Sequence, residues 1–252
     1  NKLAATYLQA SSDSVAFSTS LASLSYSHIY DEKNTFGANV NYAARRSGVG
    51  VQGGLNYSRI FTPTLYADIG FLIGTKFFPD LIIYGNAYKG LKNGYEVQAG
   101  IRLTRFSAQR GITTQGIPIF NDVNLYSLNL GASKTWEDIW LTTRVSLMRD
   151  DAFTYINVMA QTKINVNPRK DQVSIMVAGG SAPFDNQLPE GQAAFLNFSN
   201  ILIGAGYLYN ISSKTAVLVD GTWINFQSNT TDNGEFVFVN QYNLSFSIIT
   251  KF

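Results

Sequence analysis

The residues most able to support catalysis lie close together near the N-terminus. His28 is the single histidine of the chain, and Ser25, Ser27 and Asp31 lie within three residues of it. A catalytic serine needs a base within hydrogen-bonding distance, and a carboxylate can orient that base. The cluster therefore permits a lipid or peptide hydrolase, or an acyltransferase, that uses His28. Because serine and aspartate also gather near turns for backbone reasons, we expect no catalytic residues and keep this enzyme as the alternative hypothesis.

Other kinds of site chemistry have weaker support. The chain has no cysteine, which excludes disulfides and thiolate metal sites. Arg149-Asp150-Asp151 and residues 229–235 carry oxygen ligands, but they lack the ligand number and spacing of a calcium loop. Phosphate-binding glycine loops, zinc spacings and basic–aromatic stripes are absent from the sequence. We therefore expect no cofactor, no metal site and no nucleic-acid partner.

The composition favours a membrane protein that crosses the bilayer as strands. Hydrophobic residues make up 45% of the chain and charged residues only 14%, whereas about 25% of residues are charged in typical soluble domains. No uninterrupted apolar run approaches the ~20 residues of a membrane-spanning helix. Without such a helix a chain can cross a bilayer only as a closed barrel, because every backbone polar group then finds a partner.

Apolar and polar residues alternate along most of the chain with the period of two that a β-strand requires. The clearest interior case is residues 95–106, where one face carries Tyr95, Val97, Ala99, Ile101 and Leu103. Such segments run to roughly ten residues, whereas strands of soluble proteins usually have about 5–6, which disfavours a soluble secreted β protein. The sequence predicts an all-β fold, a single antiparallel transmembrane β-barrel domain over residues 1–252 with about 14 strands, or alternatively 12.

The predicted connections differ between the two ends of this barrel. One end has short turns, such as residues 31–34 and the Asn-Gly hairpin signal in residues 91–94. The other end has two long connections, residues 107–122 and 181–194. Short turns face the periplasm in outer-membrane barrels, so we expect both termini to be periplasmic. The long connections are candidate plugs for the lumen, and a slip in the alternation between Leu21 and Leu24 predicts a β-bulge.

Isolated charged residues stand among glycine and small polar residues on the wet faces of the predicted strands. We expect five of them to face the lumen: Glu96, Arg102, Arg144, Lys163 and Asp220. Acids and bases on adjacent strands of a wet lumen can pair at modest energetic cost. Ion pairs that stiffen the wall are therefore favoured over a role in solute selectivity.

The last eleven residues, 242–252, form the most regular amphipathic strand of the sequence. Its apolar face carries Tyr242, Leu244, Phe246, Ile248 and Phe252. We expect this face to contact lipid and the strand to close the barrel against residues 2–10. A terminal strand of this kind, ending on an aromatic residue, is also the expected signal for the barrel assembly machinery.

Spaced aromatic and glycine residues give the sequence a resemblance to a known family. They are Asn41-Tyr42-Ala43 with Arg46, Phe78-Pro79 before Tyr84-Gly85, Gly94-Tyr95-Glu96 with Gly100, Arg102 and Phe106, Asn124-Leu125-Tyr126, Lys134-Thr135-Trp136 and Gly179-Gly180-Ser181-Ala182-Pro183. From about residue 22 onward the chain resembles the YaiO-type family of Gram-negative outer-membrane β-barrel proteins. The resemblance implies a location in the cell outer membrane and, by analogy, a link to polysaccharide export.

The expected function is that of a non-enzymatic, porin-like barrel. In a barrel of eight strands, side chains alone are enough to fill the lumen. A barrel of about fourteen strands is wider, so its lumen has room for more than side chains. We expect either a channel or export conduit, with polysaccharide as one class of cargo, or an accessory subunit of a larger envelope complex. The expected partners are outer-membrane lipid and lipopolysaccharide, the barrel assembly machinery, and other outer-membrane proteins or lipoproteins.

Overall fold

A computed structural model describes residues 1–12, 18–45, 48–76, 78–112, 118–150, 154–168, 170–181, 200–229 and 236–252 of the chain. Its strands are β1 (Lys2–Ser12), β2 (Ser18–Ile29), β3 (Asn34–Arg45), β4 (Gly48–Thr62), β5 (Leu65–Gly74), β6 (Leu81–Gly90), β7 (Tyr95–Ile112), β8 (Pro118–Trp136), β9 (Ile139–Arg149), β10 (Thr154–Asn165), β11 (Gln172–Gly180), β12 (Asn200–Asn210), β13 (Thr215–Asn229) and β14 (Phe236–Lys251). A short 3-10 helix, η1 (Lys92–Gly94), joins β6 to β7. Within the described ranges, no helix has the length and hydropathy needed to cross a bilayer.

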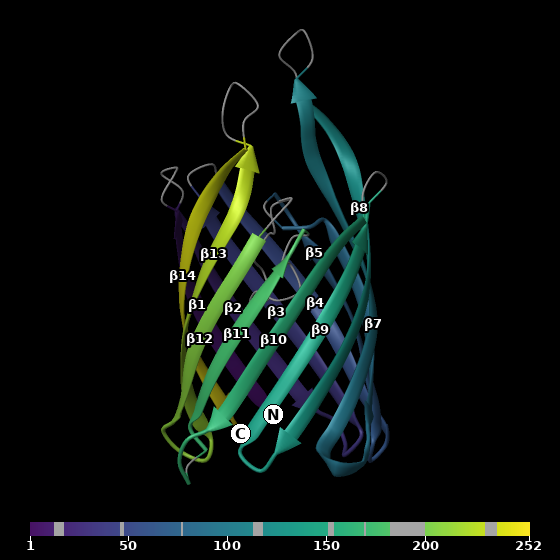
Figure 1. The fold of residues 1–252 in the computed structure, drawn as a ribbon, viewed down its shortest axis with the longest axis vertical. Helices are drawn as coiled ribbons and strands as arrows, with labels where there is room; N and C mark the ends of the chain where they lie inside the picture. The colour runs from purple at the N-terminus through teal and green to yellow at the C-terminus, as the bar shows by residue number, and fades with distance from the viewer. Residues whose placement is uncertain are drawn as a thin grey trace.

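The fourteen strands form one closed antiparallel barrel, which confirms the predicted fold class and strand number (Figure 1). Each strand pairs with its neighbours in the chain, and β1 pairs with β14 to close the ring. The closing register runs from Lys2 opposite Lys251 to Ser12 opposite Gln241. Both termini lie at the end with the short turns (Figure 1). That this end faces the periplasm stays a prediction.

The two faces of the barrel wall differ in the way that the strand alternation predicts. On β14, Leu244 is 62% exposed on the outside, whereas Asn243 and Ser245 are buried on the lumen side. Tyr242, Phe246 and Ile248 are exposed on the same outer face as Leu244. The apolar face thus points outward because the solvent there is lipid, the reverse of a soluble protein. The role of this strand as an assembly signal remains a prediction.

The turn after β6 shows how sequence sets the short-turn end. Asn93 and Gly94 both have positive φ, at 61° and 75°, a backbone region in which glycine and asparagine are least strained. A Cβ on Gly94 would lie only 2.5 Å from the backbone oxygen of Thr135 in the neighbouring strand β8. Glycine is therefore required here both for its conformation and for the close approach of β8.

A buried carboxylate organises the turn between β10 and β11. Asp171 is 2% exposed. It accepts hydrogen bonds from the Asn210 backbone N–H at 2.8 Å and from the Asn167 side-chain amide at 2.6 Å. These donors, with Asn210 the strongest, hold the pKa of Asp171 below its ordinary value of 3.8. The turn is thereby tied to the end of β12 by a group that must be ionised.

Two local predictions are wrong. Residues 107–122 are not a long connection, because β7 and β8 stay paired from Ser107 opposite Asp122 to Ile112 opposite Pro118. Gly111 instead borders a register shift in the hairpin, and Pro118 begins a strand, where its missing N–H is tolerated. The actual connection, residues 113–117, lies outside the described residues, as do residues 182–194 of the second predicted plug.

The predicted bulge in β2 is also wrong. The pairing of β2 with β1 and β3 is continuous. Leu21 breaks the apolar alternation because it faces the lumen, where it is 2% exposed, whereas Leu24 faces outward. A register shift occurs instead between Ile60 and Thr62 in β4.

We expect Leu244→Lys to destabilise the barrel by about 2–4 kcal/mol, because Leu244 lies near the middle of β14 on the lipid face, where a cation is costly. Gln161→Lys, on the partly exposed lumen face of β10, is the matched control and should change stability much less. Denaturant unfolding of both variants in phospholipid vesicles measures the difference. Equal losses of stability would contradict the assignment of the two faces.

We expect Asp171→Ala to lower stability at neutral pH. The pKa of Asp171 is lower in the folded protein than its unfolded value of 3.8. The carboxylate therefore contributes fully to folding stability above pH 3.8, and this contribution is lost as the pH falls from 3.8 through the folded pKa. The difference in unfolding midpoint between Asp171→Ala and the parent protein should therefore shrink below pH 3.8. Asp138→Ala, at an exposed position in another short turn, is the control and should lower stability at neutral pH much less.

Candidate functional site

The lumen wall formed by β5–β7 carries a hydrogen-bonded group that we call the tyrosine–carboxylate network. The Tyr66 hydroxyl donates to Glu96 Oε2 at 2.7 Å. The Asn86 amide donates to Asp68 Oδ2 at 2.9 Å. The rings of Tyr66 and Tyr88 stack with centroids 4.6 Å apart and 7° between their planes. Two carboxylates are thus held by neutral donors on a partly exposed polar surface.

Two arginines extend this polar wall. Arg144 on β9 donates through Nη2 to Gln98 Oε1 on β7 at 3.1 Å. Gly131 lies between them in the strand register, and a Cβ there would be 3.4 Å from Gln98 Oε1. The missing side chain lets Arg144 reach across β8. Arg102 donates through Nε to Thr104 Oγ1 at 3.1 Å.

The remaining charged candidates lie on other parts of the lumen. Lys163 Nζ lies 4.9 Å from the centroid of the Trp140 ring on the adjacent strand β9, a favourable cation–π geometry. Asp220 on β13 accepts a hydrogen bond from the Ser245 hydroxyl on β14. Since β13 stands nearly opposite β7 in the closed ring, Asp220 is separated from Glu96. The structure thus brings three of the five candidates onto one wall and leaves Lys163 and Asp220 outside it.

The described hydrogen bonds of three of these residues involve neutral partners, and ion pairing among the five candidates stays a prediction. Glu96 bonds to a tyrosine, Arg144 to a glutamine amide and Asp220 to a serine. The Nε atom of Arg144 is buried and finds no hydrogen-bond partner among the described residues. Alternation in the sequence reveals which face a residue occupies, but the partner depends on the register between strands.

Away from the short turns, clusters of buried apolar side chains lie on the lumen face beside polar side chains such as Asn41 and Gln52. A first buried cluster consists of Leu8, Ala10, Leu21, Ala43 and Phe78. The first four lie on the inner faces of β1–β3, whereas Phe78 comes from the connection between β5 and β6. We call residues 75–80, of which residue 77 lies outside the described ranges, the Phe78 segment. It carries an aromatic ring, 2% exposed, onto the inside of the wall.

Backbone contacts hold the Phe78 segment against the barrel. The Thr75 N–H donates to the Val51 carbonyl at 2.9 Å, and the Val51 N–H donates to Thr75 Oγ1 at 3.1 Å. The Phe78 N–H donates to the Thr75 carbonyl at 3.2 Å. A Cβ on Gly74 would lie 2.5 Å from Phe78 Cβ, so glycine at this position makes room for the ring. The segment is therefore a fixed part of the lumen wall.

Two further apolar clusters continue this lining around the barrel. They consist of Val123, Leu125, Met148 and Tyr155 on β8–β10, and of Met159, Ala178, Leu202 and Ile224 on β10–β13. Strand alternation did not predict this group of inward apolar residues, which we call the apolar collar, because it assigns polar residues to the wet face of each strand. The break in alternation at Leu21 was the available signal, and we interpreted it as a bulge.

The hypothetical catalytic cluster is not assembled in the structure. His28 is exposed on the outside of the barrel, with Nδ1 2.8 Å from Asn1 Oδ1. Ser25 and Ser27 are on the opposite, lumen-facing side of the same strand, because successive strand residues alternate. The carboxylate of Asp31 accepts hydrogen bonds within its own turn. Residues close in sequence are thus separated by the barrel wall.

The acidic stretches also lack the geometry of a metal site as far as the structure describes them. Asp150 Oδ2 accepts a hydrogen bond from the Tyr155 hydroxyl at 2.9 Å. Asp151 and residues 230–235 lie outside the described residues. Among the residues that are described, no group of three or more histidine, aspartate or glutamate side chains could hold a metal ion.

Solved structures with the same architecture are outer-membrane porins and channels. An anion-selective porin from Comamonas acidovorans aligns over 100% of both chains, with a TM-score of 0.51 and 10% identity. OmpT of Vibrio cholerae aligns over 99% of this chain and 96% of its own, with a TM-score of 0.52 and 9% identity. The deltaS2 mutant of the monoaromatic hydrocarbon channel TodX aligns over 100% and 89%, with a TM-score of 0.62 and 10% identity. At such identities the likeness establishes the fold alone.

Sequence comparison identifies the family. No curated protein matches the chain. The model of the YaiO membrane beta barrel domain matches residues 1–185, which is well over half of the 252 residues. The closed barrel and this match agree with the outer-membrane location that the sequence predicts. As its spaced aromatic and glycine residues indicate, the chain belongs to the YaiO membrane beta barrel domain family.

Proposed function

We propose that this barrel is a non-enzymatic channel for polar, hydroxyl-rich solutes and that the Phe78 segment narrows it. The observation that carries the proposal is the pairing of a polar wall, the tyrosine–carboxylate network, with an apolar collar in one lumen. In a barrel of eight strands, side chains alone are enough to fill the lumen. A barrel of fourteen strands is wider than that. The polar wall offers a route for solutes, and the collar limits their size.

The chemistry of the polar wall favours saccharides as the solute class. Carboxylate, amide and guanidinium groups can donate to and accept from sugar hydroxyls. The rings of Tyr66, Tyr88 and Trp140 offer apolar surface on the same lumen face. Polysaccharide cargo, expected from the family resemblance, is consistent with this surface.

The matched structures support a channel function for this chain, but they do not indicate which solute it carries. One is described as an anion-selective porin and another as a monoaromatic hydrocarbon channel. Related barrels thus carry different solutes, because fold and function are set by different residues. The solute proposal therefore rests on the lumen side chains of this chain.

The second candidate function is that of an accessory subunit of a larger envelope complex. The burial of Phe78 among Leu8, Leu21 and Ala43 favours it, because a collar closed by apolar contacts would pass little solute. Conductance separates the two functions. A parent barrel that conducts steadily in a planar bilayer excludes a purely structural subunit, and stoichiometric partners retained from native membranes exclude a solitary channel.

We expect Phe78→Ala to increase single-channel conductance, because the ring that packs across the inside of β1–β3 is removed. Truncating a packed phenylalanine also costs about 3–5 kcal/mol, so heat-modifiable migration on gels should first confirm a folded barrel. Phe238→Ala, on the outer face where Phe238 is 60% exposed, is the matched control and should leave conductance unchanged. Unchanged conductance in folded Phe78→Ala would refute the narrowing role.

We expect Arg144→Gln to make the channel more selective for cations. The substitution removes a fixed positive charge from the wall that also carries Asp68 and Glu96. The measurement is the reversal potential in a salt gradient. Arg59→Gln, which removes an exposed arginine on the outer face, should leave that potential unchanged. A shift of equal size in both variants would argue against passage along this wall.

A further inference from the structure

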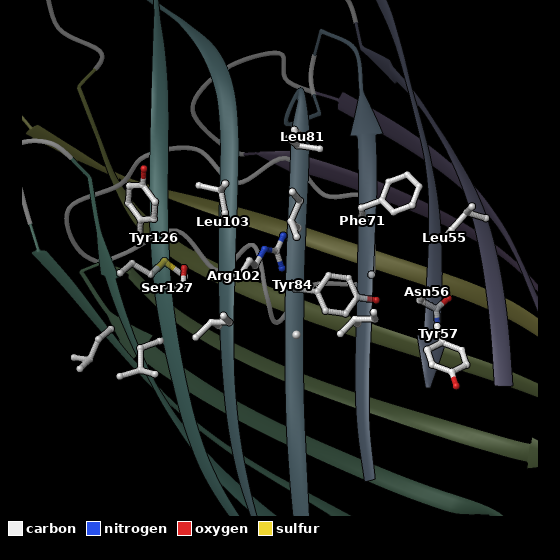
Figure 2. Close-up of a pocket in the computed structure, with 18 of the residues that line it drawn as sticks. Leu55, Asn56, Tyr57, Phe71, Leu81, Tyr84, Arg102, Leu103, Tyr126 and Ser127 are labelled. Atoms are coloured by element: carbon white, nitrogen blue, oxygen red, sulfur yellow. The ribbon is translucent and has the colours of Figure 1, made fainter. Parts of the chain in front are cut away.

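The outward face of the wall that runs from β3 to β10 carries a hollow of about 1320 Å³. Leu55, Phe71 and Leu103 line it from three strands, and their side chains alternate with those that face the lumen (Figure 2). Ile101, on the same face, is 68% exposed. The volume exceeds the ~300–1,000 Å³ usual for small-molecule sites. The hollow therefore has room for several hydrocarbon chains.

Three polar side chains lie along one edge of the hollow, at the end of the barrel away from the short turns. Tyr126 on β8 lies opposite Leu103 on β7 and opposite Arg149 on β9. Arg105 follows Leu103 by two residues on β7 and shares its face. The two arginines thus flank Tyr126, and both are exposed on the outside. Arg149 and Tyr126 belong to the lining of the hollow.

These arginines are unusual for a lipid-facing wall. A cation on the outside of a barrel costs about 2–4 kcal/mol at the bilayer middle and close to zero at an interface. The other outward-facing cations on the described strands, Arg59, Lys89 and Lys134, lie near the short turns. At the opposite end, Arg105 and Arg149 lie on either side of Tyr126, at a level where the lipid headgroups of the leaflet there carry anionic groups. Their planar guanidinium groups can bond phosphate through two parallel hydrogen bonds.

We propose that this hollow is a specific binding site for one phosphorylated, multiply acylated glycolipid of the outer leaflet. Its acyl chains lie along Phe71, Ile101 and Leu103, and Arg105 and Arg149 bind its phosphates with the Tyr126 hydroxyl between them. The phosphate charge matches the two arginines, and the volume matches more than one chain. The site depends on the predicted orientation with the short turns in the periplasm, and it is independent of what passes through the lumen.

The test is native mass spectrometry of the purified barrel with bis-phosphorylated lipid A as the probe. We expect one lipid A to be retained by the parent protein and to bind about tenfold or more weakly to the Arg105→Gln/Arg149→Gln double variant. Arg59→Gln is the matched control and should retain the lipid. Equal binding by the double variant, or an equal loss in Arg59→Gln, would overturn the proposal.

Three further arms identify which part of the lipid is recognised. Dephosphorylated lipid A should bind weakly, two-chain phosphatidylglycerol should fail to displace lipid A, and inorganic phosphate should not compete. Ile83→Trp, which fills the hollow without changing its charge, should also weaken binding. Displacement by phosphatidylglycerol or by phosphate would show an unspecific anion contact, and full binding by Ile83→Trp would exclude the hollow as the acyl site. Heat-modifiable migration verifies that each variant is folded.

Discussion

The pairing of β1 with β14 is the contact on which the rest of the structure depends. An open sheet would expose two rows of backbone N–H and C=O groups to hydrocarbon, where each unsatisfied group costs several kcal/mol. The continuous register from Lys2 opposite Lys251 to Ser12 opposite Gln241 removes both edges. Closure also divides every strand into a lipid face and a lumen face, and so it fixes what each side chain can contact.

The lumen combines two chemistries that a channel can use together. Near the short turns, Tyr66, Asp68 and Glu96 are part of a polar wall whose carboxylates are held by neutral donors. Farther along, the inward ring of Phe78 joins leucines of the wall. The polar wall and the inward ring of Phe78 thus occupy successive levels of one lumen.

The outer wall is likewise more than a uniform apolar surface. The hollow between β3 and β10 breaks the lipid-facing wall, and Arg105 and Arg149 lie along its edge on either side of Tyr126. A wall with a shaped apolar surface and local charge can select among the lipids that surround it. The two proposed sites therefore lie on opposite faces of the same strands, because strand alternation separates neighbouring residues by the thickness of the wall.

Alternation and turn residues by themselves determined the strand number, the closing pair and the outward face of Leu244, because lipid and water demand opposite side chains along each strand. Only the tertiary structure decided which residues meet across strands. Arg144 reaches Gln98 over Gly131, and Phe78 enters the lumen from a connection. Register and inward folding arise from contacts between residues distant in sequence, which periodicity within one segment does not encode. By contrast, His28 and Ser27 lie on opposite sides of the wall because successive residues of one strand alternate between its two faces.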